Sequence, residues 1–467
     1  MPPLLFRSTN GQSPAVDLRE AFHAGLAPDR GLYLPEKFPR LAPDEIAAFA
    51  KLPYHEIAFR VLSKYTASII PDEEFAGMCR AAYNFPIPLE IIHDRVFLMR
   101  LDQGPTASFK DFAAQMMARM FGHFLRQDGR QVTILTATSG DTGSAVAHAF
   151  HKVPGVNVIV LFPIAEVSES QRKLMTTLRD NVRTVAIDGK FDDCQAMVKR
   201  AFADPDLKHI PLSSANSINI GRLLPQSVYY FYAASRIAKP GEPMVFSIPS
   251  GNFGDTMGAV VAREMGLPVR KIIASVNDND AFPRFLASGV YHKICPSRNS
   301  VSNAMNVGHP SNLARLVAIY GGQMDETGRI HRQPDLPAMR RDVFSTSVSD
   351  DRTRAALKNF WDKYQMLLEP HGAVAWQGFL DWLEAESVGR ASPRAGPSGA
   401  SPCQDSPAAI IETANPAKFP EEIQKMMNWE PDIPPGMAAG LKLPEDFDRM
   451  GADYEKFRAY LIQRHAA

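Results

Sequence analysis

Between residues 96 and 276 the chain alternates short apolar segments with helical patterns, and this alternation restricts its fold more than any other feature. Strands that alternate with helices form a parallel sheet whose two faces are covered. The expected strands are 96–99, 132–136, 156–162, 182–187, 244–248, 272–276 and 408–412, and the expected helices are 109–125, 144–150, 171–178, 191–202, 223–237 and 256–265. The sequence therefore predicts an α/β fold with parallel sheets flanked by helices.

A chain of 467 residues is too long for one hydrophobic core, so we expect several domains. Residues 1–95 mix helical patterns with proline-rich breaks and form an N-terminal domain. Residues 96–235 are expected to form a smaller α/β domain, and residues 236–467 a larger one. Within the larger domain, residues 387–407 are rich in Ser, Pro, Gly and Ala, which predicts an exposed, mobile loop.

Composition excludes several classes of partner. Lys plus Arg and Asp plus Glu both number 51, and no basic run is visible, so nucleic-acid binding is not expected. No apolar run is long enough to cross a bilayer and no signal peptide is recognisable, which predicts a cytoplasmic protein without a membrane partner. The four cysteines contain no CxxC pair, so neither a zinc site of that kind nor a disulfide framework is expected: Cys79, Cys194, Cys295 and Cys403.

One lysine has surroundings that favour chemistry over solvation. Lys110 lies in the segment Gly104–Asp111, at the start of a strongly apolar helix, where Phe109 and Phe112 bracket it. Most lysines are solvated surface residues. An apolar environment and the positive end of a helix dipole both lower the pKa of an ammonium group, and a neutral amine attacks aldehydes.

Two glycine-containing turns follow predicted strands, where ligands of parallel sheets bind. Thr138–Gly143 offers hydroxyls and the free N–H groups of a helix start, although an ordinary capped turn is the favoured interpretation of this segment on its own. Pro249–Asp255 is suited to a phosphate but is not a nucleotide P-loop. A lysine nucleophile together with two anion sites is what pyridoxal phosphate and an amino-acid substrate require.

Several segments resemble the threonine synthase family, and the resemblance extends over nearly the whole chain. The segment Gly104–Phe112 is similar to the cofactor-lysine motif GPTxxFKDF of that family. The other similar segments are Arg7–Gly11, Gly25–Tyr33, Thr136–Phe150, Ser214–Arg222, Pro249–Asp255, Glu369–Ala375 and Glu412–Phe419. The resemblance implies the tryptophan-synthase-like fold of pyridoxal-phosphate enzymes, fold type II, with an N-terminal threonine-synthase-type domain.

The resemblance also implies roles for individual residues. Lys110 is the Schiff-base lysine, and Thr413 faces the pyridine nitrogen, where a hydroxyl lets that nitrogen stay neutral. The residues implied to bind the cofactor phosphate are Gly251, Asn252, Phe253, Gly254 and Asp255. Those implied to lie near the ring and the substrate carboxylate are Ser139, Gly140, Asp141 and Thr142. The family usually has His where this chain has Asn415, which affects the expected substrate contacts.

The implied reaction converts O-phospho-L-homoserine and water into L-threonine and phosphate, by γ-elimination and β-addition, with Lys110 moving protons at Cα, Cβ and Cγ. The candidates for holding the leaving phosphate are Lys418, Arg222, Asn216 and Ser217; for the two cations, surface ion pairing is an equally good interpretation. His371 could line the site, but a histidine whose hydrogen bonds are satisfied inside the fold is the favoured interpretation.

Two other functions remain open at this point. A related pyridoxal-phosphate lyase or dehydratase acting on phosphorylated or free hydroxy-amino acids would release ammonia and a 2-oxo acid from the same type of site. A binding protein that kept the fold would need a damaged cofactor site. The sequence predicts a monomer or a homodimer and does not distinguish them.

Overall fold

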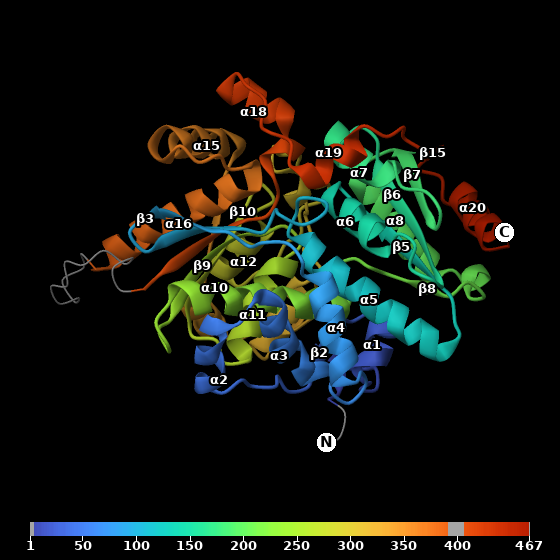
Figure 1. Cartoon of the computed structure of the whole chain (residues 1–467), viewed down its shortest axis with the longest axis horizontal. Coiled ribbons are helices and arrows are strands. Elements are labelled where there is room, and N and C mark those ends of the chain that lie inside the picture. The colour runs from blue at the N-terminus through green and yellow to red at the C-terminus, as the bar shows by residue number, and fades with distance from the viewer. Residues whose placement is uncertain (1–3, 391–405, 467) are drawn as a thin grey trace.

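The computed structural model describes residues 4–390 and 406–466, and in this part of the chain two large sheets, parallel except for one edge pair, are each covered by helices on both faces (Figure 1). The predicted α/β architecture is therefore confirmed. The two sheets stand side by side, and a third group of helices, from the N-terminal residues, lies beneath both in the view of Figure 1.

The larger sheet has six strands in the order β13-β10-β9-β14-β4-β3, and only the β3–β4 pair is antiparallel. Alternate residues of its strands are buried in two different hydrophobic cores, one on each face of the sheet. Because both faces are buried, the sequences of these strands are continuous apolar runs. Helices α15 and α16 cover one face and α10, α11, α12 and α14 the other. The strands are β3 (Leu89–His93), β4 (Val96–Arg100), β9 (Met244–Pro249), β10 (Val269–Val276), β13 (Val343–Ser347) and β14 (Ala408–Glu412). The helices are α10 (Val228–Ile237), α11 (Gly254–Glu264), α12 (Ala281–Ser288), α13 (Leu313–Ile319), α14 (Leu336–Asp342), α15 (Asp350–Tyr364) and α16 (Pro370–Arg390).

The smaller sheet has five parallel strands in the order β15-β7-β6-β5-β8. Helices α8 and α20 pack on one face, and α5 and α6 pack on the other. The strands are β5 (Val132–Ala137), β6 (Val156–Pro163), β7 (Val182–Asp188), β8 (Leu212–Ser213) and β15 (Asp448–Gly451). The helices are α5 (Lys110–Asp128), α6 (Asp141–Phe150), α7 (Glu169–Thr176), α8 (Phe191–Ala203), α9 (Ile220–Leu223), α18 (Pro420–Met427), α19 (Pro435–Leu441) and α20 (Tyr454–Ala466).

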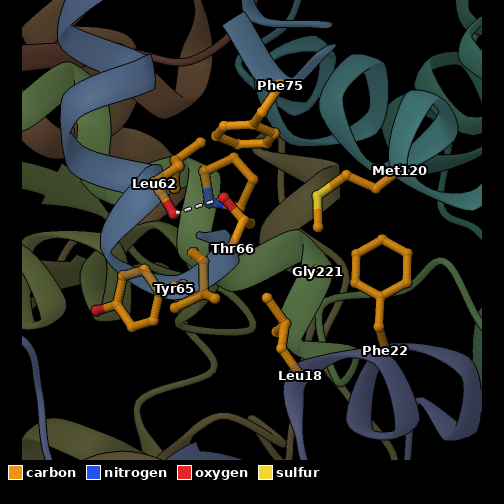
Figure 2. A pocket seen from close by; sticks show the side chains of 10 residues that line it. Leu18, Phe22, Leu62, Tyr65, Thr66, Phe75, Met120 and Gly221 are labelled. Carbon is orange, nitrogen blue, oxygen red and sulfur yellow. Dashed lines mark hydrogen bonds between the residues drawn. The ribbon is translucent and has the colours of Figure 1, made fainter. Parts of the chain in front are cut away.

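The N-terminal residues pack against helix α5 through aromatic and aliphatic side chains. Phe22 contacts Phe121 with ring centroids 4.7 Å apart, and a small apolar cavity remains between these elements and Gly221 (Figure 2). A Cβ on Gly221 would lie 2.1 Å from the Phe22 ring, so this close packing needs glycine. The elements are β1 (Phe6–Ser8), α1 (Leu18–Ala24), β2 (Tyr33–Pro35), α2 (Pro43–Ala48), α3 (Tyr54–Thr66) and α4 (Asp72–Ala82), with a further hairpin, β11 (Gln323–Met324) and β12 (Ile330–Arg332), nearby in the larger domain.

Two sequence predictions are corrected in detail. The helix predicted over 223–237 is divided, because Pro225 lies in a 3₁₀ turn, Leu224–Ser227, between α9 and α10. The predicted loop at 387–407 is wrong at both ends: α16 continues to Arg390, and Ser406 is buried beside β14. Residues 391–405 lie outside the described residues.

The sheets combine segments from both sides of the predicted domain boundaries. Strand β4, which the sequence division placed in the smaller domain, pairs with β14 in the larger sheet. Strand β15, from the last twenty residues of the presumed larger domain, pairs with β7 in the smaller sheet. The division of the chain into three consecutive domains therefore remains a proposal. Each of the two sheets is built from strands that lie in separate parts of the sequence. Within residues 4–390 and 406–466, no helix combines the length and apolarity needed to cross a membrane.

Candidate active site

A cavity with about 810 Å³ of empty space, part of it open solvent, lies between the two sheets. Three strand ends meet there: Thr138 follows β5, Gly251 lies two residues beyond β9, and Thr413 follows β14. Parallel sheets bind ligands at the carboxyl ends of their strands. The predicted site residues that line the cavity are Lys110, Ser139, Asp141, Thr142, Asn216, Ser217, Arg222, Gly251, Asn252, Phe253, Gly254, Asp255 and Thr413.

Lys110 is held in the cavity by the loop that precedes α5. The carboxylate of Asp111 accepts hydrogen bonds from the backbone N–H and the hydroxyl of Thr106, at 2.8 and 2.7 Å, which closes the loop. The N–H of Phe109 donates to the carbonyl of Thr413 at 2.8 Å. The loop is therefore tied to the segment after β14, which brings two residues about 300 positions apart in sequence into one site.

The Lys110 side chain is largely removed from solvent, with 14% of it exposed. Burial lowers its pKa, and the charges of Lys418 and Arg222 act in the same direction, against the opposing charge of Asp141. Its nitrogen lies 4.8 Å from the centre of the Phe109 ring, as the sequence suggested. Phe112 does not bracket the amine: it packs among Tyr83, Phe85 and Tyr229.

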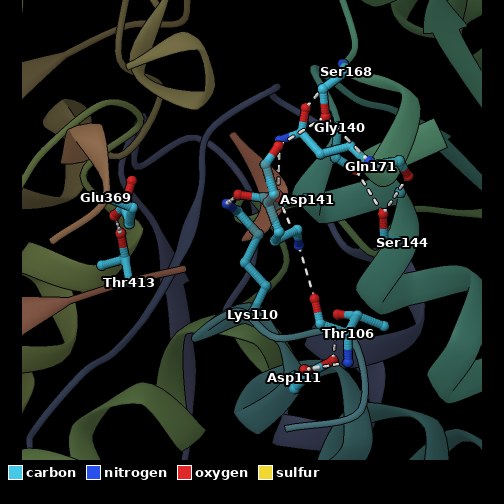
Figure 3. Close-up of polar contacts among 12 residues, drawn as sticks. Thr106, Lys110, Asp111, Gly140, Asp141, Ser144, Ser168, Gln171, Glu369 and Thr413 are labelled. Carbon is cyan, nitrogen blue, oxygen red and sulfur yellow. Dashed lines mark hydrogen bonds and ion pairs between the residues drawn. The ribbon is translucent and has the colours of Figure 1, made fainter. Parts of the chain in front are cut away.

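Asp141 is shared by two lysines (Figure 3). Its Oδ2 lies 3.5 Å from the Nζ of Lys110 and its Oδ1 lies 2.8 Å from the Nζ of Lys418. Burial raises the pKa of Asp141, but the charges of Lys418 and Lys110 outweigh burial and hold the pKa below its usual range. Gln171 donates to the same carboxylate at 3.0 Å. Asp141 is thus a fixed anion beside the reactive amine.

The predicted phosphate loop has unpaired backbone donors. No N–H group of Gly251, Asn252 or Phe253 donates to another residue in the described part of the chain, and α11 begins directly behind them. Phe253 has φ +61°, and its ring contacts Phe282 with centroids 4.7 Å apart, which anchors the turn. A Cβ on Gly251 would lie 2.8 Å from the Cα of Met305, so only glycine fits. Free N–H groups at a helix start form an anion site.

Asp255 contributes an acid to this wall of the cavity. Tyr229 and Tyr230 both donate hydroxyl protons to its Oδ1, whereas its Oδ2 is buried without a partner. Burial raises the pKa of Asp255 to about 6, although both tyrosines act to lower it. Asp255 can therefore hold a proton beside this candidate anion site.

The hydroxyl of Thr413 is hydrogen-bonded to a buried carboxylate. This hydroxyl donates to the Oε1 of Glu369 at 3.2 Å, and Figure 3 shows this pair apart from the group around Lys110. A threonine hydroxyl has one proton, so in this arrangement only its lone pairs face the cavity. A neutral ring nitrogen, as predicted, would require the hydroxyl proton to turn away from Glu369.

The predicted phosphate-binding candidates separate into two groups. Arg222, Asn216 and Ser217 line the cavity, and Arg222 is 2% exposed with its Nε unpartnered. Burial lowers the pKa of Arg222 to about 10. Lys418 is fully buried outside the lining, where its Nζ donates to the carbonyl of Thr106 at 2.8 Å and pairs with Asp141. Neither cation is a surface residue, so the alternative of surface ion pairing is wrong for both.

The remaining predicted residues support the site. Gly140 has φ +133°, and a Cβ there would lie 2.6 Å from Gln171, so it shapes the turn before α6. Asn415, where the family usually has His, donates to Asp102 at 2.9 Å and caps a short 3₁₀ turn. Two residues that sequence reasoning did not assign also belong here: Glu369 and the cavity-lining Met305. The motif Glu369–Ala375 was the only signal for Glu369.

Comparisons with known proteins agree with this geometry. A model described as "Pyridoxal-phosphate dependent enzyme" matches residues 85–393, "Threonine synthase N terminus" matches residues 5–83, and "Threonine synthase, C-terminal" matches residues 396–461. A threonine synthase of Haemophilus influenzae is 37% identical over 96% of this chain and 97% of its own length. The crystal structure of threonine synthase from Escherichia coli is 34% identical, with a TM-score of 0.85 over 99% of this chain and all of that one. A PLP-bound threonine synthase from Brucella melitensis is 33% identical, with a TM-score of 0.88 and the same coverage.

Proposed function

The chain belongs to the threonine synthase family of pyridoxal-phosphate-dependent enzymes, and from this membership we propose how its own residues convert O-phospho-L-homoserine and water into L-threonine and phosphate. The predicted family, fold type II and cofactor are confirmed. The observation that carries the proposal is the meeting of Lys110 and the loop Gly251–Asp255 in one cavity.

The residues present fit the cofactor. Lys110 supplies a buried amine of lowered pKa for a covalent bond to the aldehyde carbon. The unpaired N–H groups of Gly251, Asn252 and Phe253 would hold the phosphate, and Thr413 would lie at the ring nitrogen. When bound, pyridoxal phosphate draws electrons from the substrate and makes the protons on its carbon atoms acidic.

Lys110 moves the protons in this proposal. Once the substrate is bound, Lys110 would take the Cα proton, because burial lowers its pKa and so favours the neutral amine that this step needs. Asp141 lies 3.5 Å from Nζ and stabilises the ammonium that results. Lys418 already neutralises part of the charge of Asp141, which weakens the attraction between Asp141 and the Lys110 ammonium. The ammonium can therefore return its proton to carbon.

The cations and turns of the other wall hold the substrate. Arg222 is buried at the cavity without a carboxylate partner in the described chain, which suits it to the leaving phosphate together with Asn216 and Ser217. The start of α6, with Ser139 and Thr142 at the cavity, suits the substrate carboxylate. The cytoplasmic location and the monomeric or homodimeric state stay predictions.

Two measurements test the proposal. Purified enzyme given O-phospho-L-homoserine should form threonine and phosphate in equal amounts; ammonia and a 2-oxo acid would instead indicate the related lyase. Borohydride reduction followed by peptide mass spectrometry should find the cofactor mass on Lys110. Lys110→Ala should lose both turnover and the attached mass, and an attachment elsewhere would contradict the assignment.

A further inference from the structure

His371 differs from the buried structural histidine expected from the sequence. Its side chain is 3% exposed, in the first turn of α16, and it lines the cavity. Its Nδ1 pairs with the Oε2 of Glu369, but its Nε2 is buried without a hydrogen-bond partner. A buried ring nitrogen left unpaired costs stability unless a ligand completes it.

Glu369 fixes the protonation pattern of this ring. The carboxylate accepts the backbone N–H of His371 at 2.7 Å, the N–H of Gly372 at 3.0 Å and the Thr413 hydroxyl at 3.2 Å. Because a carboxylate can only accept hydrogen bonds, the contact between Glu369 and the ring is one in which the Nδ1–H of His371 donates to Oε2. In the neutral ring, a proton on Nδ1 puts the lone pair on Nε2, and this tautomer can act as a base from Nε2.

The ring is also held in place. Phe419 packs against the imidazole with ring centroids 5.2 Å apart, and Glu369 is fully buried, so neither partner rotates freely. His371 belongs to α16 of the larger domain, whereas Lys110 begins α5. His371 and Lys110 nevertheless line the same cavity. The two bases thus reach one site from different elements.

The proposed reaction needs such a second base, and this inference rests on the proposed function. Lys110 holds one additional proton at a time, which serves the transfers at carbon. When water adds to Cβ, one O–H bond breaks as the O–Cβ bond forms, and the released proton needs a separate acceptor. The phosphate that has already left from Cγ can take that proton afterwards, which balances the reaction.

We propose that His371, positioned by Glu369, is a catalytic base that takes the proton of the water molecule adding to Cβ, separately from Lys110. His371→Gln keeps the size and polarity of the side chain but cannot accept a proton under these conditions. Phosphate leaves before the water adds, so the variant should release the first equivalent of phosphate at the wild-type rate. Its rate of threonine formation should fall by about 10²- to 10⁴-fold.

Rapid-quench measurements of a single turnover separate these two steps. The matched control is His123→Gln, because His123 is equally buried but does not line the cavity. Its Nδ1 lies 2.6 Å from Glu74, whose side chain is 42% exposed, and its Nε2 is unpartnered. This variant should form both products at wild-type rates. Equal slowing of phosphate and threonine in His371→Gln, or no slowing, would overturn the proposal.

Chemical rescue separates a catalytic role from a structural one. Added imidazole should restore threonine formation in His371→Ala without changing the rate of phosphate release, and no rescue in a variant that retains bound cofactor would count against the base. If His371→Gln does not fold, this second variant supplies the decision. If the proposed function itself is wrong, wild-type enzyme will release no phosphate from O-phospho-L-homoserine, an outcome that differs from every result above.

Discussion

Lys418→Met tests whether the buried charges around Lys110 act as one unit. The Nζ of Lys418 lies 2.8 Å from Asp141, and the two side chains are 0% and 2% exposed. The chain supplies a matched control in Lys425, whose Nζ lies 2.8 Å from Glu422 with the lysine side chain 67% exposed. Lys425→Met removes an ion pair of the same length from the surface.

The expected magnitudes differ because burial differs. At 2.8 Å and an effective dielectric constant of about 20, the Lys418–Asp141 attraction is about 6 kcal/mol before desolvation is subtracted. Lys418→Met leaves the buried Asp141 carboxylate with the more distant Lys110, at 3.5 Å, so its cost should approach the value of about 3–5 kcal/mol that breaking a buried pair takes. Lys425→Met should cost less than about 1 kcal/mol, since water screens an exposed pair.

Urea unfolding of the apoprotein, followed by both circular dichroism and tryptophan fluorescence, measures this difference where the two signals coincide. A second measurement reports on the pKa of the Lys110 amine. The charge of Lys418 lowers the pKa of Lys110, so Lys418→Met should raise that pKa and move the pH dependence of pyridoxal-phosphate uptake to higher pH. Equal losses of stability in the two variants, together with an unmoved uptake profile, would refute the idea that these charges are coupled.

Two further predictions concern the phosphate wall. In Gly251→Ala, the new Cβ would lie 2.8 Å from the Cα of Met305, so the loop must move and lose one or two N–H bonds to phosphate. One such bond contributes about 1.5–3 kcal/mol, so equilibrium titration of the apoprotein should show a pyridoxal-phosphate affinity at least about tenfold weaker. The control Gly77→Ala, in an open helical position, should not change this affinity. Asp255 has a pKa raised by burial to about 6, above the value of about 3.9 expected when unfolded, so its contribution to stability is complete below pH 4 and is lost as pH rises to 6. Asp255→Asn should therefore gain about 3 kcal/mol relative to wild-type apoprotein between pH 4 and pH 7 in urea unfolding, and a constant difference across that range would contradict the raised pKa.

Local sequence patterns predicted much of the fold correctly. The strands β4 to β7, β9, β10 and β14 were predicted from apolar runs, because both faces of these strands are buried. In the two sheets, strands β3, β8, β13 and β15 were missed. β8 and β15 are very short or polar, and β3 and β13 are edge strands of mostly partly exposed residues, so none has the buried apolar run that marks a central strand.

The chain order concealed how the sheets are assembled. Sequence division placed β4 with the smaller domain because the strand directly precedes α5, yet β4 pairs with β14. Hydrogen bonding between strands depends on partners far away in sequence, which no local pattern reports. The same limitation applies to β15, which joins the smaller sheet from the C-terminal end of the chain.

By itself, the sequence determined the residue types on which the chemistry depends: a lysine at the start of an apolar helix, and glycine turns after strands, recognisable through their family motifs. Only the tertiary structure decided what those side chains contact. Lys418 proved to be a buried partner of Asp141, and the Nε2 of His371 was left unpaired at the cavity. The physical reason is that burial and charge pairing fix protonation and reactivity, and both arise from atoms that folding brings together across hundreds of residues.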